Sequence, residues 1–267
     1  MTTTNQPNLD TVAKFHRLLA KEGVKPDHIN TPNNNIGKRR NLAEYLIMGC
    51  PKINTECEVV INQLPEGHEL ARLILNDNYI TAEEVAKVYN FSYSDEQLQH
   101  LEETLPDMET ILWLRANEYL LIAGPSTDLN ILQVRDLDNK LFSSKDGGWY
   151  SNDKEKFAKD DKVKAGEWLA IRKEAVPNSF SKTWEEQQKL ITDTKHVPNA
   201  SEVSYVITTY FKVREVRLFE NKYVRTSSVD VDGYHVYVGS FVENGLYVNF
   251  CRDDYRSGYI GVASSRE

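Results

Sequence analysis

Two short segments near the C-terminal end, residues 234–238 and 246–250, alternate apolar side chains with polar ones. Successive side chains of a strand point to opposite faces, so this period predicts strands with one buried and one exposed face. Asp-Gly at 232–233 and Asn-Gly at 244–245 supply tight turns before the two strands. The side chains expected to face inward are Val236, Val238, Leu246, Val248 and Phe250. This part of the chain is therefore expected to fold as a half-buried antiparallel sheet.

The preceding residues set the order of elements in the C-terminal half. WLAIRKE at 168–174 is an apolar segment between Gly166 and Pro177, which is typical of a strand. Helices are expected at 183–191 and 200–213, where apolar residues recur at helical spacing. Further short strands are expected at 216–219, 223–226 and 259–263. The order is then one strand, two helices and a run of antiparallel strands, and we expect 168–172 to pair with the closing strand around Val262 and Ala263.

The first 140 residues have mainly helical patterns. Thr81 with Glu84, and Ser94 with Gln97, are the pairs of a capping box, in which two side chains satisfy free amides at a helix start. Other helices are expected at 9–22 and from Pro106 onward, followed by an apolar strand at Tyr119–Ala123. The charged segment 143–166 has the pattern of a surface loop or linker. We therefore expect an α+β chain with a helical N-terminal region, residues 1–140, and a second domain, residues 141–267.

Composition argues against several classes of partner. The chain carries 40 Asp and Glu against 32 Lys and Arg, a net charge of −8, which disfavours nucleic acid and anionic membranes. No apolar run approaches the roughly 20 residues of a membrane-spanning helix, and the polar N-terminus does not have the pattern of a secretory signal. Cys50, Cys57 and Cys251 are odd in number and show no metal-ligand spacing. We expect reduced thiols, folding in a cytoplasm-like compartment, and neither cofactor nor metal.

The sequence lacks the motifs of the common enzyme classes, including the Gly-x-Ser-x-Gly elbow, His-Glu-x-x-His, the phosphate loop and the dinucleotide fingerprint. Asp253 and Asp254 are adjacent acids, but neighbours on a strand point to opposite faces and do not meet one substrate. We expect no catalytic residue. Two alternatives stay open: an uncharacterised enzyme that uses Asp253, Asp254 or His235, and an assembly protein whose aromatic strands form a subunit interface.

The side chains expected on the outward face are unusual for a solvated sheet. They are Tyr, His, Asn and Cys, and the following residues 252–259 add further Arg, Ser, Gly and Tyr. Antibody-like binding surfaces favour such residues because they combine large contact area with adaptable hydrogen bonding. Between Tyr223 and Arg266, Glu243 is the single representative of Lys, Glu, Gln, Met and Trp. Strands are depleted in Lys and Glu in any case, so an ordinary sheet remains the alternative explanation.

The order of elements resembles that of the variable proteins of diversity-generating retroelements. WLAIRKEAVPNS at 168–179, RTSS at 225–228 and the closing GVASSR at 261–266 are similar to segments of that family. The resemblance covers roughly residues 147–267 and implies a C-type lectin fold there, with a ligand-facing surface near the C-terminus. Its diversified positions arise by mutation of template adenines, which yields Tyr, His, Ser, Asn, Cys, Arg, Gly, Phe or Asp but never the five depleted types.

Carried over to this sequence, the resemblance implies a set of diversified ligand-binding positions and a fixed scaffold. The diversified positions are Tyr234, His235, Tyr237, Ser240, Tyr247, Asn249, Cys251, Arg252, Ser257, Gly258 and Tyr259. The scaffold is Val236, Val238, Leu246, Val248, Gly261, Val262 and Ala263. The chain lacks the Glu-Pro-Asn or Gln-Pro-Asp calcium signature and the disulfides of sugar-binding lectins, as well as the paired cysteines of formylglycine-generating enzymes. These departures argue against calcium-dependent carbohydrate binding. The expected ligand is a protein of unknown identity.

Overall fold

The computed structural model describes residues 66–192 and 195–266. All described residues belong to one compact unit, Pro65–Glu267. The helix expected at 9–22, together with Cys50 and Cys57, lies outside them. Within the described ranges, no helix combines the length and the apolar character needed to span a membrane.

The described part of the chain contains eight α-helices. They are α5 (Gly67–Leu75), α6 (Ala82–Tyr89), α7 (Asp95–Glu103), α8 (Met108–Ala116), α9 (Ile131–Leu137), α10 (Phe157–Asp160), α11 (Trp184–Gln188) and α12 (Ala200–Arg214). The capping boxes expected at Thr81 and Ser94 are confirmed at the starts of α6 and α7. Asn130, Thr183 and Asn199 cap α9, α11 and α12 in the same way. Local sequence thus fixes where these helices begin.

The strands of the described residues form three sheets. The strands are β1 (Tyr79–Ile80), β2 (Tyr119–Ala123), β3 (Leu129–Asn130), β4 (Lys162–Val163), β5 (Trp168–Arg172), β6 (Lys195–His196), β7 (Tyr223–Val229), β8 (His235–Val242), β9 (Gly245–Phe250), β10 (Ile260–Val262) and β11 (Ser265–Arg266). The largest sheet has the order β1-β2-β5-β11-β6, and the second has the order β10-β7-β8-β9. β3 and β4 form a small antiparallel pair. The prediction of a mixed α+β chain is confirmed.

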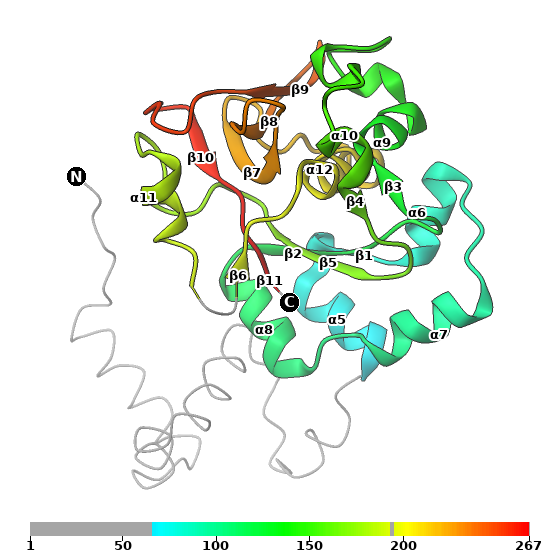
Figure 1. Cartoon of the computed structure of the whole chain (residues 1–267). Coiled ribbons are helices and arrows are strands. Elements are labelled where there is room, and N and C mark those ends of the chain that lie inside the picture. Colours follow the sequence, from blue (N-terminus) through cyan, green and yellow to red (C-terminus); the bar gives the residue numbers. More distant parts are fainter. Residues whose placement is uncertain (1–65, 193–194, 267) are drawn as a thin grey trace, which may run out of the picture. The chain divides into compact units, whose positions relative to one another are not determined.

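Helix α12 lies between the two larger sheets and forms the centre of the main core (Figure 1). Tyr205 on this helix is completely buried and its hydroxyl donates to the Ala123 carbonyl of β2 at 3.0 Å. Helices α5 and α8 cover the opposite face of the five-stranded sheet with a second apolar cluster (Figure 1). The architecture is therefore layered, with α12 supporting the inner face of β7–β9.

The alternation in the C-terminal strands is borne out, with one exception. Val236, Val238, Leu246 and Val248 are buried in the main core, as expected. Phe250 was expected to face inward but is 37% exposed, because it lies at the end of β9 and packs against the Trp149 ring at 4.7 Å between ring centroids. The remaining scaffold residues Gly261, Val262 and Ala263 are also buried.

Two local predictions are wrong. Residues 216–219 do not form a strand, because Glu215 and Phe219 have left-handed backbones, φ 58° and 53°, that turn the chain from α12 into β7. The helix expected to open at Pro106 begins at Met108 instead. Asp107 is its N-cap, and its Oδ1 accepts the Thr110 amide at 2.8 Å.

The closing strands also differ from expectation in register and direction. β5 pairs with β11, Ser265 opposite Ile171, rather than with Val262 and Ala263. β10 instead joins the other sheet, and it runs parallel to β7 rather than antiparallel. The reason is that loop 251–259 carries the chain across the sheet from β9 to the far side of β7 (Figure 1). The last residues therefore connect the two larger sheets.

The expected boundary at residues 140 and 141 falls inside the compact unit that begins at Pro65. Strand β2, which precedes it, pairs with β5, which follows it, along five residues. The segment 143–166 is not a surface loop or linker throughout, since Tyr150, Phe157 and Val163 are buried in the main core. Strand pairing that is distant in sequence thus joins the two parts into one layered structure.

Gly261 lies where β10 passes closest to its neighbours. A Cβ atom at this position would meet Ala175 Cβ at 2.5 Å and Ser179 Oγ at 2.6 Å. We expect Gly261→Ala to lower the free energy of unfolding by about 1–3 kcal/mol through overpacking. Gly258→Ala is the matched control, because its Cβ would meet only Ser181 Oγ at 3.9 Å. Denaturant unfolding checks both, and equal stability of the two variants would contradict the packing.

Candidate ligand-binding surface

Strand register places four of the expected positions on one face of β8 and β9. Tyr237 lies opposite Asn249, and Tyr247 lies opposite Gly239. His235 precedes Tyr237 by two residues and therefore shares its face. All four side chains are half-buried or exposed, whereas the intervening apolar residues are buried. The two strands thus separate the expected variable positions from the expected scaffold.

Five further expected positions lie in loop 251–259, which crosses the outer side of the same sheet. They are Cys251, Arg252, Ser257, Gly258 and Tyr259. Arg252, Gly258 and Tyr259 are exposed, and Cys251 and Ser257 are half-buried. The loop 251–259 follows β9 directly in the chain. We call the outer face of β8 and β9, together with this loop, the recognition surface.

Register does not bring Tyr234 and Ser240 into this row. Tyr234 precedes β8, and its amide donates to Asp230 Oδ1 at 2.8 Å. Ser240 lies at an irregularity of β8 with φ 46°, and its amide donates to the Lys222 carbonyl at 2.8 Å. Both side chains are half-buried, Tyr234 just before β8 and Ser240 two residues before its end.

The tyrosines of the recognition surface differ in exposure. Tyr259 is 65% exposed. Tyr255, which is not among the carried-over positions, is 55% exposed. Tyr237 is half-buried and packs edge-on against Tyr223 with ring centroids 5.0 Å apart. Burial raises the pKa of Tyr237 to about 12. Two exposed rings, those of Tyr255 and Tyr259, are therefore the best placed to contact a partner.

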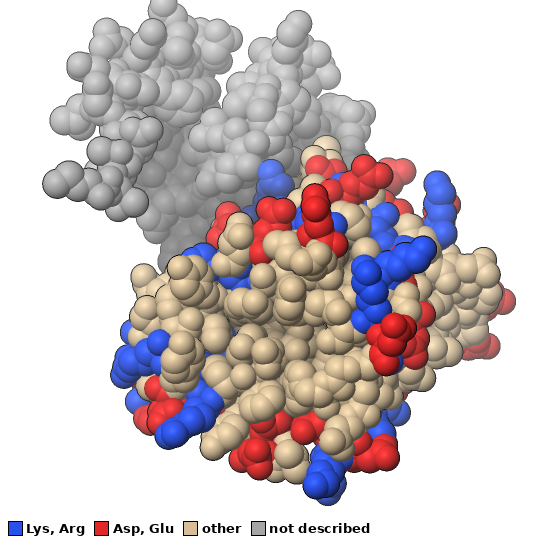
Figure 2. Space-filling view, turned by 90° about the horizontal axis from the view of Figure 1, so that it is seen from above, with Lys and Arg blue, Asp and Glu red and all other residues tan. Residues whose placement is uncertain are grey.

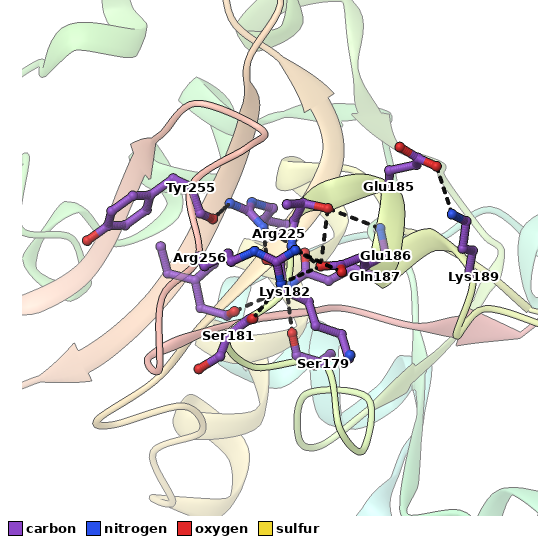
Figure 3. Close-up of polar contacts among 12 residues, drawn as sticks. Ser179, Ser181, Lys182, Glu185, Glu186, Gln187, Lys189, Arg225, Tyr255 and Arg256 are labelled. Carbon is purple, nitrogen blue, oxygen red and sulfur yellow. Dashed lines mark hydrogen bonds and ion pairs between the residues drawn. The ribbon is translucent and has the colours of Figure 1, made fainter.

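Arg225 of β7 lies beneath the recognition surface and is completely buried. One terminal nitrogen donates to Gln187 Oε1 at 2.9 Å and to the Lys182 carbonyl at 3.2 Å. The other donates to the Tyr255 carbonyl at 2.8 Å, and Figure 3 shows the guanidinium between Tyr255 and Gln187. The sequence signal for this site is an arginine in the strand Tyr223–Val229, whose other six residues carry no charge.

Gln187 connects Arg225 to the closing strand. Its side chain is completely buried, and its amide nitrogen donates to the carbonyls of Ser179 and Ile260 at 2.8 and 3.1 Å. The Ser179 hydroxyl in turn accepts the Val262 amide at 3.2 Å. A buried polar network thus runs from the loop through β7 and α11 to β10.

His235 and Asp253, two residues of the enzyme alternative, are in contact. His235 Nδ1 lies 2.8 Å from Asp253 Oδ2, and the imidazole stacks on Trp184 with ring centroids 3.7 Å apart. Burial lowers the pKa of His235, although the Asp253 carboxylate opposes the effect. Asp254 does not join them and instead pairs with Arg252 at 2.8 Å. The contact between His235 and Asp253 fixes the loop to β8.

The view from above the top of Figure 1, the side of β8, β9 and β10, has a broad central area without charged side chains (Figure 2). Lys, Arg, Asp and Glu surround this area (Figure 2).

Among the residues that the structure describes, no three His, Cys, Asp or Glu side chains gather in a way that would hold a metal ion. Comparisons with protein-family models, curated proteins and solved structures find no match to this chain.

The half-buried imidazole of His235 makes the stability of the protein depend on pH. Because the folded pKa of His235 lies below the unfolded value of about 6.5, the folded protein binds fewer protons between the two values. The stability that His235 contributes is therefore fully present above the unfolded pKa and is lost as the pH falls toward the folded pKa. We expect the melting temperature to fall more between pH 7.5 and 5 in the wild type than in His235→Gln. An equal fall of the melting temperature in the two proteins would contradict this.

The exposed tyrosines should contribute little to folding. We expect Tyr255→Ala and Tyr259→Ala each to change the free energy of unfolding within about 0.5 kcal/mol. Tyr150→Ala is the control, because its ring is completely buried and its removal costs about 3–5 kcal/mol. Denaturant unfolding measures all three, and a large loss for Tyr255 or Tyr259 would make these rings structural.

Proposed function

We propose that this chain is a ligand-binding protein whose recognition surface is diversified by a retroelement. The observation that carries the proposal is the separation of side chains on β8 and β9. Residues expected to vary, such as Tyr247 and Asn249, lie on the outer face, and the fixed residues Val236, Val238 and Val248 are buried beneath. Side chains on such a face can change with little effect on the core, because they lose little burial.

The proposal includes a C-type lectin-like fold for residues 141–267. Its support is the antiparallel pairing of β5 with β11, which joins the beginning and the end of this part of the chain. Helices α11 and α12 lie between β5 and the strands β7–β9, in the order that the resemblance implies. Pairing of β2 with β5 adds to this arrangement a strand that precedes the expected domain.

The proposed ligand is a protein. Protein interfaces are depleted in charge at their centre and enriched in tyrosine and arginine, with charged residues at the rim. An uncharged area with a charged rim, and exposed Tyr255 and Tyr259 near Arg252 and Arg256, have this character. The pairing of His235 with Asp253 under Trp184 is assigned a structural role, so no catalytic group is proposed.

The DNA around the gene tests the retroelement. We expect a second copy of the segment that encodes 234–259, beside a reverse-transcriptase gene. It should differ from the gene mainly where the copy has adenine, in codons for positions such as Tyr247, Asn249 and Tyr259. The codons for Val236, Val238 and Val248 serve as the internal control and should be identical in both copies. A genome with no such repeat, or with differences spread evenly over both sets of codons, would refute diversification.

A further inference from the structure

The buried position of Arg225 has a consequence for the loop above it. We infer that Arg225 is a positioning residue that holds the main chain of residues 251–259 in one conformation whatever outward side chains the loop carries. A role of this anchoring in ligand recognition rests on the proposed function. The anchoring itself is a property of the fold and can be measured without a ligand.

The loop atoms that Arg225 binds are mostly main-chain atoms. Its guanidinium donates to the carbonyls of Tyr255 at 2.8 Å and Arg252 at 3.4 Å. The single loop side chain that it contacts is Cys251, whose Sγ lies 3.3 Å away. A carbonyl oxygen is present at every residue, so replacement of the side chains at 252 and 255 does not remove these acceptors.

The framework holds the rest of the loop in the same way. The Trp184 amide donates to the Asp253 carbonyl at 2.9 Å, and the Ser181 amide donates to the Ser257 carbonyl at 2.7 Å. The Tyr223 amide donates to the Tyr259 carbonyl at 2.8 Å. Donors from the segment 181–184 and from β7 thus alternate along the loop, and each of them binds a carbonyl.

Side chains of the loop contribute weaker attachments. Arg252 pairs with Asp254 within the loop, and Arg256 reaches Glu186 and the Ser181 carbonyl (Figure 3). The side chains of Arg252, Asp254 and Arg256 are more than half exposed, and ion pairs at such positions contribute little to stability. The exception is Asp253, whose carboxylate accepts the His235 amide at 3.1 Å.

The energetics explain why this anchor is strong. Among the described residues no carboxylate pairs with Arg225, and its Nε has no hydrogen-bond partner. If the loop shifted so that its carbonyls no longer faced the guanidinium while water stayed excluded, a buried cation would lose its acceptors, which is strongly unfavourable. Gln187 orients the guanidinium through its Oε1, while its amide nitrogen is bound to two carbonyls. Lysine lacks the planar fork that reaches both sides at once.

Amide hydrogen exchange at Ser181 and Trp184 tests the inference. These amides donate to loop carbonyls but belong to the framework, so they are unchanged when loop residues are substituted. In the combined variant Arg252→Ser, Asp254→Ser and Tyr255→Ser, we expect their exchange to stay within about threefold of the wild type, because the carbonyls remain. In Arg225→Lys we expect it to rise about tenfold or more, because the loop loses its buried donor. The Val238 amide in β8 reports whether the sheet stays folded.

Arg256→Lys is the matched control, since it makes the same change in an exposed arginine that touches the same segment. In Arg256→Lys we expect no increase in exchange at the amides of Ser181 and Trp184. If Arg225→Lys does not fold, Gln187→Met replaces it, because the loss of Oε1 misorients the guanidinium and should also raise exchange at Ser181 and Trp184. The inference is overturned if the triple serine variant raises exchange as Arg225→Lys does, or if neither Arg225→Lys nor Gln187→Met raises it. No ligand enters the measurement, so these outcomes are independent of whether the surface binds a protein.

Discussion

A guanidinium that is shielded from water requires acceptors in the protein, and the C-terminal part of this structure is arranged around one. Arg225 projects from the outer face of β7 and draws together the Lys182 carbonyl, Gln187 and the carbonyls of loop 251–259. The opposite face of the same sheet is apolar and packs on α12. The sheet is therefore held on one side by hydrophobic burial and on the other by a directional polar network, which fixes the loop in position.

This division has consequences for what the surface can do. Hydrophobic burial tolerates few changes at Val236, Val238 or Val248, because a cavity in a close-packed core is costly. Hydrogen bonds to main-chain carbonyls do not depend on which side chains point outward. A loop held in this way is preorganised, so a partner would not have to bear the entropic cost of ordering it. Exposed tyrosines on such a loop can form a binding surface at little cost to the fold.

Sequence reasoning succeeded where short-range patterns decide the structure. Capping boxes at Thr81 and Ser94 mark helix starts because the two side chains that satisfy the free amides are three residues apart. Alternation in β8 and β9 identified the buried face because one face of the sheet packs on a helix. It failed at 216–219, where left-handed backbones turn an apolar segment away from extension, and at Phe250, where the strand ends beyond the edge of the core.

By itself the sequence determined the α+β class, the helix starts and the inward and outward sets of β8 and β9, because all of these follow from spacing within a few residues. The tertiary structure alone decided that β10 runs parallel to β7 and that β5 pairs with Ser265 and Arg266 of β11 rather than with Val262 and Ala263. It also decided that Arg225 is buried under the loop and that Tyr237 packs against Tyr223. These features depend on contacts between residues distant along the chain, and the free energy of such contacts is set by which surfaces meet, which local pattern does not encode.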